Sequence, residues 1–245
     1  MRRWWPGERP ASGGGTGSGP AEDGTPGGGP PQDRSPGDEP PPAASTHRPF
    51  PASGWVRWVV ALLAGALPAL TFPAPSLWWL AYVALVPWLL LIRSAGTVRR
   101  AALDGWIGGI GFVVAVHHWL MPSLHVFIVL LGALLGLLWA PWGVLAWRLL
   151  GGRPSARRAA AAVVAVPSGW LAIELVRSWE GLGGPWGLLG ASQWEVAPAL
   201  RVASVGGVWL VSLLVVAVNT ALVLLATART GARTAAGVLL VACAL

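Results

Sequence analysis

Six apolar stretches follow one another from residue 55 onward, and each is close to the length of a membrane-crossing helix. A helix needs about 20 residues to cross the hydrocarbon core of a bilayer. The sequence predicts crossings at 55–71, 76–92, 103–121, 124–147, 159–178 and 202–226. A further apolar run starts near Ala235 and continues to Leu245, so we expect the given sequence to stop inside a seventh crossing. The pattern predicts an all-α fold, a polytopic bundle of transmembrane helices.

Residues 1–53 differ in composition from the rest of the chain. They are rich in Gly, Pro and Ser and hold almost no aliphatic side chains whose burial would offset the entropy lost on ordering. No apolar core of signal-peptide length follows Arg2 and Arg3. We therefore expect two parts, a disordered cytoplasmic tail at 1–53 and a transmembrane domain at 54–245.

The composition excludes a soluble globular domain, because 54% of the residues are hydrophobic and only 11% are charged. All 17 basic residues are Arg, and the single cysteine is Cys243. Beyond residue 50, twelve Arg stand against four acidic residues. This basic excess beside apolar segments favours anionic membrane lipids as partners, and we expect no nucleic acid.

Arginine placement predicts the orientation in the membrane. If the tail is cytoplasmic, ten of the arginines beyond residue 50 lie inside, and only Arg177 and Arg201 lie outside. This distribution agrees with the positive-inside rule, so we expect a multi-pass cell-membrane protein. Many of the 17 Trp lie near predicted crossing ends, Trp142 and Trp170 among them, and we expect these to anchor the helices at the interface.

A polar, glycine-rich turn at 174–194 separates two of the apolar stretches and is the first candidate for function. Backbone at membrane depth must bond internally, so such a turn must be covered by protein or line a wet cavity. Glu174 and Arg177 are three residues apart and share one helical face near the outer interface. They form an ion pair with each other, or Arg177 binds a lipid phosphate or anionic substrate that Glu174 orients.

The middle of the turn adds groups that suit a lipid head region. Pro185 after two glycines predicts a tight turn, and Trp186 would form a rigid apolar wall. Ser192 and Gln193 supply a hydroxyl and an amide that can bond to ester or glycerol oxygens without the burial of a charge. The turn therefore predicts a substrate-binding site on the outer face.

Other polar residues indicate less. Asp104 lies near the start of a predicted helix, where an acid suits the positive end of the helix dipole, so we expect it to cap that helix. His117 and His118 point away from each other on a helix, so we expect no metal and no other cofactor. Glycines in the crossing at 103–121 predict a close approach of helix backbones.

Several motifs in this region resemble the membrane half of apolipoprotein N-acyltransferase, the family that makes the third acylation of bacterial lipoproteins. The resemblance covers about residues 55–245 and depends on the order and spacing of its motifs. These are Phe72-Pro73-x-Pro75, His118-Trp119, Glu174-x-x-Arg177-x-Trp179, Pro185-Trp186-x-x-x-Gly190-x-Ser192-Gln193, and Gly206-Gly207-Val208-Trp209-x-Val211-Ser212 followed by Asn219.

The resemblance implies a bacterial plasma-membrane enzyme with an eight-span membrane domain and a nitrilase-like domain inserted outside the membrane. In that family a Glu base, a Lys and a Cys nucleophile pass an acyl chain from a phospholipid donor through a thioester to the diacylglyceryl-cysteine of an apolipoprotein substrate. In this chain, Trp186 and Gln193 would line the lipid crevice, with Glu174 and Arg177 at the headgroup level.

The chain departs from the family because it contains no Lys, and Cys243 lies deep in an apolar run without a charged neighbour to activate it. We therefore expect no catalytic residue here, and we expect this fragment to be inactive alone. One alternative is a non-catalytic membrane scaffold, a split or degenerate acyltransferase. Another is a small transporter, which Gly/Pro-broken helices suggest and the lack of a mid-span charge disfavours.

Overall fold

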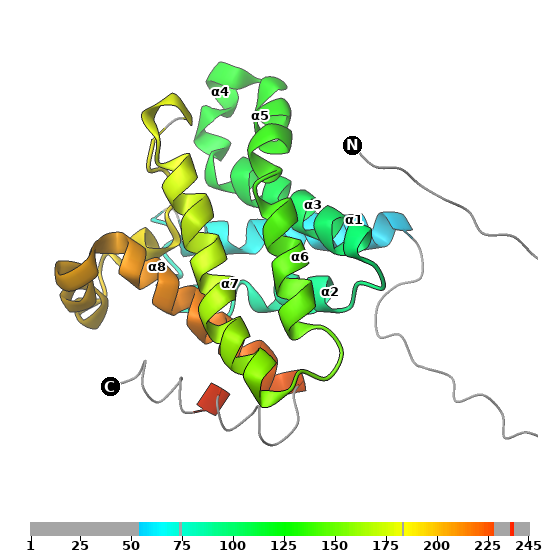
Figure 1. Ribbon diagram of the computed structural model, residues 1–245. Helices are drawn as coiled ribbons and strands as arrows, with labels where there is room; N and C mark the ends of the chain where they lie inside the picture. The colour runs from blue at the N-terminus through cyan, green and yellow to red at the C-terminus, as the bar shows by residue number, and fades with distance from the viewer. Residues whose placement is uncertain (1–53, 74, 183, 228–235, 238–245) are drawn as a thin grey trace, which may run out of the picture. The chain divides into compact units, whose positions relative to one another are not determined.

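The computed structural model describes residues 54–73, 75–182, 184–227 and 236–237 (Figure 1). Within these residues every regular element is a helix, which confirms the predicted all-α class. The predicted tail at 1–53 and almost all of the predicted seventh crossing lie outside the described residues. These two expectations stay predictions.

The helices follow the six apolar stretches in order. The first stretch forms α1 (Gly54–Ala66) and the 3-10 helix η1 (Leu67–Thr71), and the second forms η2 (Trp78–Tyr82) and α2 (Val86–Arg93). The third and fourth form α3 (Val98–Val116), η3 (His118–Leu120), α4 (Met121–Leu124), α5 (Phe127–Gly136) and α6 (Trp139–Leu150). The last two form α7 (Ala156–Arg177) and α8 (Ala197–Thr227), with η4 (Glu180–Leu182) and η5 (Leu189–Gln193) between them.

Three segments are long and apolar enough to cross a membrane, namely Gly54–Thr71, Ala156–Arg177 and Ala197–Thr227. Two bent pairs raise the count to five if each is one crossing: α3 with the following η3 and α4, bent by 63°, and α5 with α6, bent by 43°. The second predicted crossing is a shorter apolar segment, Trp78–Arg93, in which a turn separates η2 from α2. The described residues therefore hold three to five candidate crossings.

An aromatic cluster forms the centre of this helical unit, between α2, α3, α6 and α7. Trp88, Trp139, Trp142 and Trp170 are all buried, and Phe112 packs with them at centroid distances of 5.2 to 6.4 Å between neighbouring rings. The prediction that Trp142 and Trp170 anchor the membrane interface is wrong. In helices that are apolar on every side, the hydrophobic pattern does not separate core positions from surface positions.

Helix α3 packs against α1, α5 and α6 through its glycines. A Cβ atom on Gly105 would overlap the Trp139 carbonyl of α6, and one on Gly111 would overlap the Leu62 carbonyl of α1. The predicted close approach of helix backbones is confirmed. This packing places α1 and α6 against different faces of α3, and α6 in turn packs against α7.

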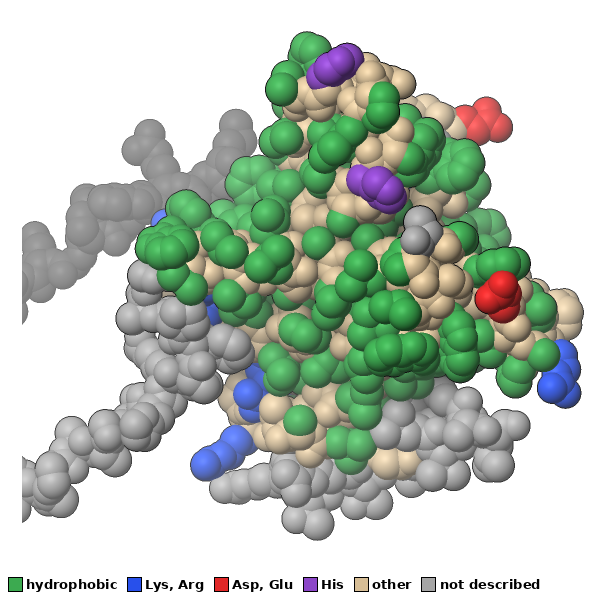
Figure 2. Space-filling view, turned by 180° about the vertical axis from the view of Figure 1, so that it is seen from behind, with side chains coloured by type: hydrophobic (Ala, Val, Ile, Leu, Met, Phe, Trp, Pro, Cys, Tyr) green, Lys and Arg blue, Asp and Glu red, His purple; other side chains and the backbone are tan. Residues whose placement is uncertain are grey.

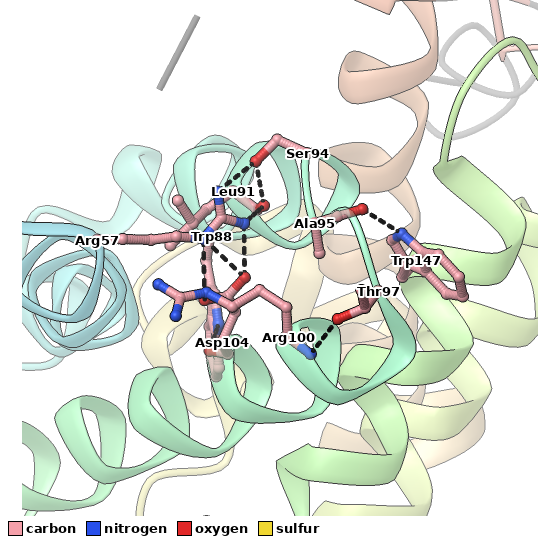
Figure 3. Close-up of polar contacts among 9 residues, drawn as sticks. All are labelled: Arg57, Trp88, Leu91, Ser94, Ala95, Thr97, Arg100, Asp104 and Trp147. Atoms are coloured by element: carbon pink, nitrogen blue, oxygen red, sulfur yellow. Dashed lines mark hydrogen bonds and ion pairs between the residues drawn. The ribbon is translucent and has the colours of Figure 1, made fainter. Parts of the chain in front are cut away.

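Asp104 does not cap α3, so that prediction is wrong. The N-cap is Thr97, whose hydroxyl accepts a hydrogen bond from the Arg100 amide at 3.2 Å. Asp104 lies further along the helix, is fully buried, and pairs with Arg57 of α1 at 2.6 Å between Oδ2 and Nη2 (Figure 3). The physical reason is that a carboxylate within an apolar helix is costly to bury unless a cation pairs with it. This cost outweighs the small stabilisation that an acid gives at a helix N-terminus.

Arg57 completes this buried cluster with its remaining donors. It donates to the Ser94 hydroxyl at 3.0 Å and to the Leu91 carbonyl at 2.7 Å, both at the end of α2 (Figure 3). Arg100 contacts the other Asp104 oxygen at 3.4 Å. The cluster therefore ties α1, α2 and α3 together at one end of the helical unit.

The surface of this unit is apolar over wide areas. Figure 2 shows hydrophobic side chains over most of the face seen, with arginines in its lower half and histidines in its upper half. Val126, Phe127 and Leu134 are among the exposed large apolar residues. Soluble monomers rarely expose contiguous apolar surface on this scale, so the face suits contact with lipid.

Candidate functional site

The candidate site lies where α7 ends and a loop at 178–188 leads to η5 and α8. Glu174 occupies the last turn of α7 and is fully buried. Its Oε1 atom accepts hydrogen bonds from the Trp170 indole N–H at 2.8 Å and from the Leu189 amide at 2.7 Å. One carboxylate oxygen therefore joins α7 to the first residue of η5.

Arg177 lies one turn after Glu174, but the two side chains do not form an ion pair. Within the described ranges, the ion pairs at contact distance are those of the cluster at the other end of the unit. The Arg177 guanidinium instead donates to the carbonyl oxygens of Trp186 at 3.2 Å and Gly187 at 3.1 Å. Of the two roles predicted for Arg177, pairing with Glu174 is not found, and the guanidinium holds the loop backbone.

The same guanidinium rests on the aromatic core. Its central carbon lies 5.4 Å from the ring centroids of both Phe112 and Trp139, which is a cation–π arrangement. Gly187, which supplies one of the accepting carbonyls, has φ +71°, and a side chain there would also overlap Val116. The loop therefore turns tightly over a cation that the aromatic rings stabilise.

Ser192 and Gln193 belong to η5, which follows the loop, and are both buried. The Ser192 hydroxyl donates to the Leu189 carbonyl at 2.7 Å. Gln193 Nε2 donates to the Ser192 hydroxyl and to the Trp78 carbonyl, each at 2.9 Å. These bonds connect η5 to η2, which lies 115 residues earlier in the sequence.

Two polar residues of α8 bind the backbone of neighbouring segments. The Ser212 hydroxyl accepts a hydrogen bond from the Gly190 amide at 2.8 Å. The Asn219 amide accepts from the Leu85 N–H at 3.0 Å and donates to the Ala81 carbonyl at 2.8 Å. Both residues belong to the motif at 206–219, but neither was predicted as a site residue. Their polarity inside a long apolar helix was the signal of a buried contact.

Pro185 and Trp186 lie on the surface of the loop and are both exposed. The Trp186 side chain is 57% exposed, and its ring lies 5.5 Å from that of Trp119 at an angle of 59°. Trp119 belongs to η3, directly after α3, and is itself half exposed. Two indoles from distant parts of the sequence thus meet on the surface above the buried polar groups.

The sequence of this region matches a known protein family. The family model of the apolipoprotein N-acyltransferase N-terminal domain matches residues 64–221, which include α3, α7, the loop and most of α8. The chain belongs to this family. The matched range contains all six residues that the sequence predicted for the site.

Curated relatives of this N-terminal domain are identical to it at about one residue in three. The apolipoprotein N-acyltransferase of Chromobacterium violaceum is 33% identical over 195 residues, which cover 75% of this chain and 36% of that protein. The enzyme of the same name from Pseudomonas paraeruginosa is 35% identical over 182 residues, 69% of this chain and 34% of the relative. The chain thus spans about a third of the length of the curated relatives it matches.

The structure places the six predicted site residues of this N-terminal domain in two groups. Pro185 and Trp186 lie on the loop surface. The other four lie behind the loop in bonded, buried positions, namely Glu174, Arg177, Ser192 and Gln193.

Two acceptor atoms behind the loop have no hydrogen-bond partner among the described groups, Glu174 Oε2 and Gln193 Oε1. The Ser212 hydroxyl lies near the Glu174 carboxylate but outside hydrogen-bond geometry. A buried acceptor without a donor costs about 1 to 3 kcal/mol, so both atoms favour a bound water or a donor group of a ligand. Binding and positioning are the chemistry that this arrangement can perform.

Proposed function

We propose that this chain is the membrane part of an apolipoprotein N-acyltransferase that transfers an acyl chain from a phospholipid to the N-terminal diacylglyceryl-cysteine of lipoproteins. The observation that carries the proposal is the loop at 178–188, which Glu174 and Arg177 hold so that Pro185 and Trp186 reach the surface. Family membership supports the reaction class. The partners in this proposal are the phospholipid acyl donor, the apolipoprotein substrate and the surrounding membrane lipids.

The lipid substrates contact the wall formed by Pro185, Trp186 and Trp119. Paired indoles suit the boundary between acyl chains and headgroups, because each ring is apolar but carries one N–H donor. The four buried side chains position this wall. The free acceptor atoms of Glu174 and Gln193 serve a substrate donor or a water molecule that enters behind it.

The acyl transfer itself needs a nucleophile from outside the described residues. The sequence holds no Lys, and its only cysteine, Cys243, is not among the described residues. In the proposed enzyme, a Glu, a Lys and a Cys of a nitrilase-like domain carry the acyl group through a thioester, while this domain holds the lipids. The chain alone is therefore inactive in this proposal.

The proposed topology has six crossings and the start of a seventh in a bacterial plasma membrane, with the tail at 1–53 in the cytoplasm. Arg93, Arg148 and Arg158 gather where α2, α6 and α7 meet, whereas Trp119 and Trp186 lie at the opposite end of α7. Arginine-rich ends face the cytoplasm in membrane proteins. The Trp186 loop accordingly faces outward.

Substitution of Trp186 tests the proposed lipid wall. The complete coding region that contains this chain is expressed in bacteria depleted of their own N-acyltransferase, and mass spectrometry measures N-acylated lipoprotein N-termini. We expect Trp186→Ala to lower acyl transfer about tenfold, which corresponds to ~1.4 kcal/mol of lost transition-state stabilisation. Protein abundance should stay normal, since the side chain is mostly exposed.

The matched control is Trp194→Ala. Trp194 is 50% exposed on the same stretch of chain, and no aromatic partner is recorded for it within the described residues. We expect near-normal transfer from this variant. Unchanged transfer by Trp186→Ala would remove Trp186 from the site, and an equal loss in both variants would indicate a general effect of surface indoles.

A further inference from the structure

A second polar region lies at the end of the unit away from the Trp186 loop. A cavity of about 450 Å³ opens where the end of α2, the end of α6 and the start of α7 meet. Its lining is Arg93, Ala95, Trp147, Arg148, Gly151, Gly152 and Arg158. Three guanidinium groups therefore surround one cavity.

The guanidinium groups of Arg93 and Arg158 are only partly used by the protein. Arg93 donates through Nη2 to the Gly152 carbonyl, and Arg158 donates through Nη2 to the carbonyls of Gly151 and Leu149. Both arginines keep further N–H groups beyond these contacts, since each guanidinium has five donors. Arg148 is exposed, and no protein hydrogen bond of its side chain is recorded in the described part of the chain. The cavity is thus lined by three cationic side chains, of which Arg148 makes no protein hydrogen bond among the described residues.

No carboxylate among the described residues neutralises these arginines. Of the four described acidic residues, Asp104 pairs with Arg57 and Arg100. The other three belong to the last turn of α7 or to the chain after it, at the other end of that helix. An anion is therefore the ligand that this cavity lacks.

The geometry points to the phosphate group of an anionic phospholipid as that ligand. Arginine presents forked donors that match phosphate oxygens, and basic pockets between membrane helices recognise anionic headgroups. The neighbouring indole of Trp147, which donates to the Ala95 carbonyl at 2.7 Å, is a side chain typical of the headgroup level. Since this cavity lies at the opposite end of α7 from the Trp186 loop, the lipid is a bound lipid of the other leaflet and not the acyl donor.

Ligand-dependent thermal unfolding of the full chain in a non-ionic detergent tests this site. Dioctanoyl phosphatidylglycerol, dioctanoyl phosphatidylcholine and inorganic phosphate are titrated separately. We expect saturable stabilisation by phosphatidylglycerol, which carries a net negative charge, and weaker effects of the other two probes. Arg158→Gln should raise the apparent Kd for phosphatidylglycerol about tenfold or more, because it removes a charge-assisted hydrogen-bond donor.

Two further variants make the test selective. Arg157→Gln is the matched control, because Arg157 lies in the same first turn of α7 but is exposed and does not line the cavity; it should change the Kd less than twofold. Arg148→Gln removes a cavity arginine that makes no recorded protein hydrogen bond, so it should weaken binding even if Arg158→Gln does not fold.

Three outcomes would overturn the assignment. The first is equal loss of binding in Arg157→Gln and Arg148→Gln, which would indicate a general effect of surface charge. The second is binding of inorganic phosphate as tight as that of phosphatidylglycerol, which would exclude a lipid-specific site. The third is stabilisation by phosphatidylglycerol that persists unchanged in Arg148→Gln and Arg158→Gln.

Discussion

The two buried carboxylates of this domain, Asp104 and Glu174, lie in contrasting surroundings. Asp104 has an arginine on each side, and both of its oxygens are bonded. Glu174 uses one oxygen for two N–H donors and leaves the other without a partner, while its neighbour Arg177 binds loop carbonyls. The first cluster is closed and fastens three helices, whereas the second holds a surface loop and keeps an acceptor free.

The contrast indicates that the Asp104 cluster serves the stability of the helical unit, whereas Glu174 serves the position of the surface loop. Removal of one partner of a buried ion pair destabilises the fold, because the other charge stays in apolar surroundings. A polar group that positions a loop stabilises the fold less, since its partners can reach water when the loop opens. We therefore expect substitutions at the two carboxylates to have effects of different size and place.

The largest effect is expected for Asp104→Asn. The substitution leaves the Arg57 guanidinium, which is 11% exposed, without a counter-charge, and loss of one partner of such a pair costs about 3 to 5 kcal/mol. Thermal unfolding in detergent and the membrane yield measure this loss. Arg99→Gln is the control, because Arg99 is exposed and no hydrogen bond of its side chain is recorded among the described residues. Equal unfolding temperatures for the two variants would show that the Asp104 cluster does not stabilise the packing of α1, α2 and α3.

A smaller and more local effect is expected for Glu174→Ala. The Trp170 indole and the Leu189 amide would each lose an acceptor, at about 1 to 3 kcal/mol for a buried donor. Limited proteolysis should cut the loop at 178–188 faster than in the unchanged chain, well below the unfolding temperature. Glu174→Gln keeps an acceptor for these donors and should protect the loop better. Faster cleavage in Asp104→Asn than in Glu174→Ala would reverse the comparison.

The apolar pattern predicted the helices well because each stretch is long and bounded by polar residues. The breaks inside the stretches were not predicted, and in the second stretch the turn between Tyr82 and Val86 consists of the apolar residues 83–85, which leave no mark in hydropathy. The third and fourth stretches form bent helix pairs, so the count of candidate crossings is three to five among the described residues. Pattern analysis identifies which segments are apolar, but it does not find a break made of apolar residues.

The sequence predicted the position of the site in the chain better than it predicted the contacts of the site residues. The density of Gly, Pro and polar groups at 174–194 identified the loop, because such backbone needs cover in a membrane. The partners of Arg177 were not predictable, since they are backbone carbonyls and aromatic rings that any sequence offers. Arg57 was counted only as a topological charge, and its pairing across 47 residues depends on how α1 crosses α3.

The central claim is that the Trp186 loop faces outward as a lipid wall, and cysteine labelling tests it most directly. In a Cys243→Ser background, Gly181→Cys places a thiol on the exposed loop, and Arg153→Cys places one at the exposed opposite end of α7. A membrane-impermeant maleimide is applied to intact cells. The account predicts labelling at position 181 in intact cells and at position 153 only after permeabilisation. The reverse pattern would contradict the orientation and, with it, the proposed lipid site.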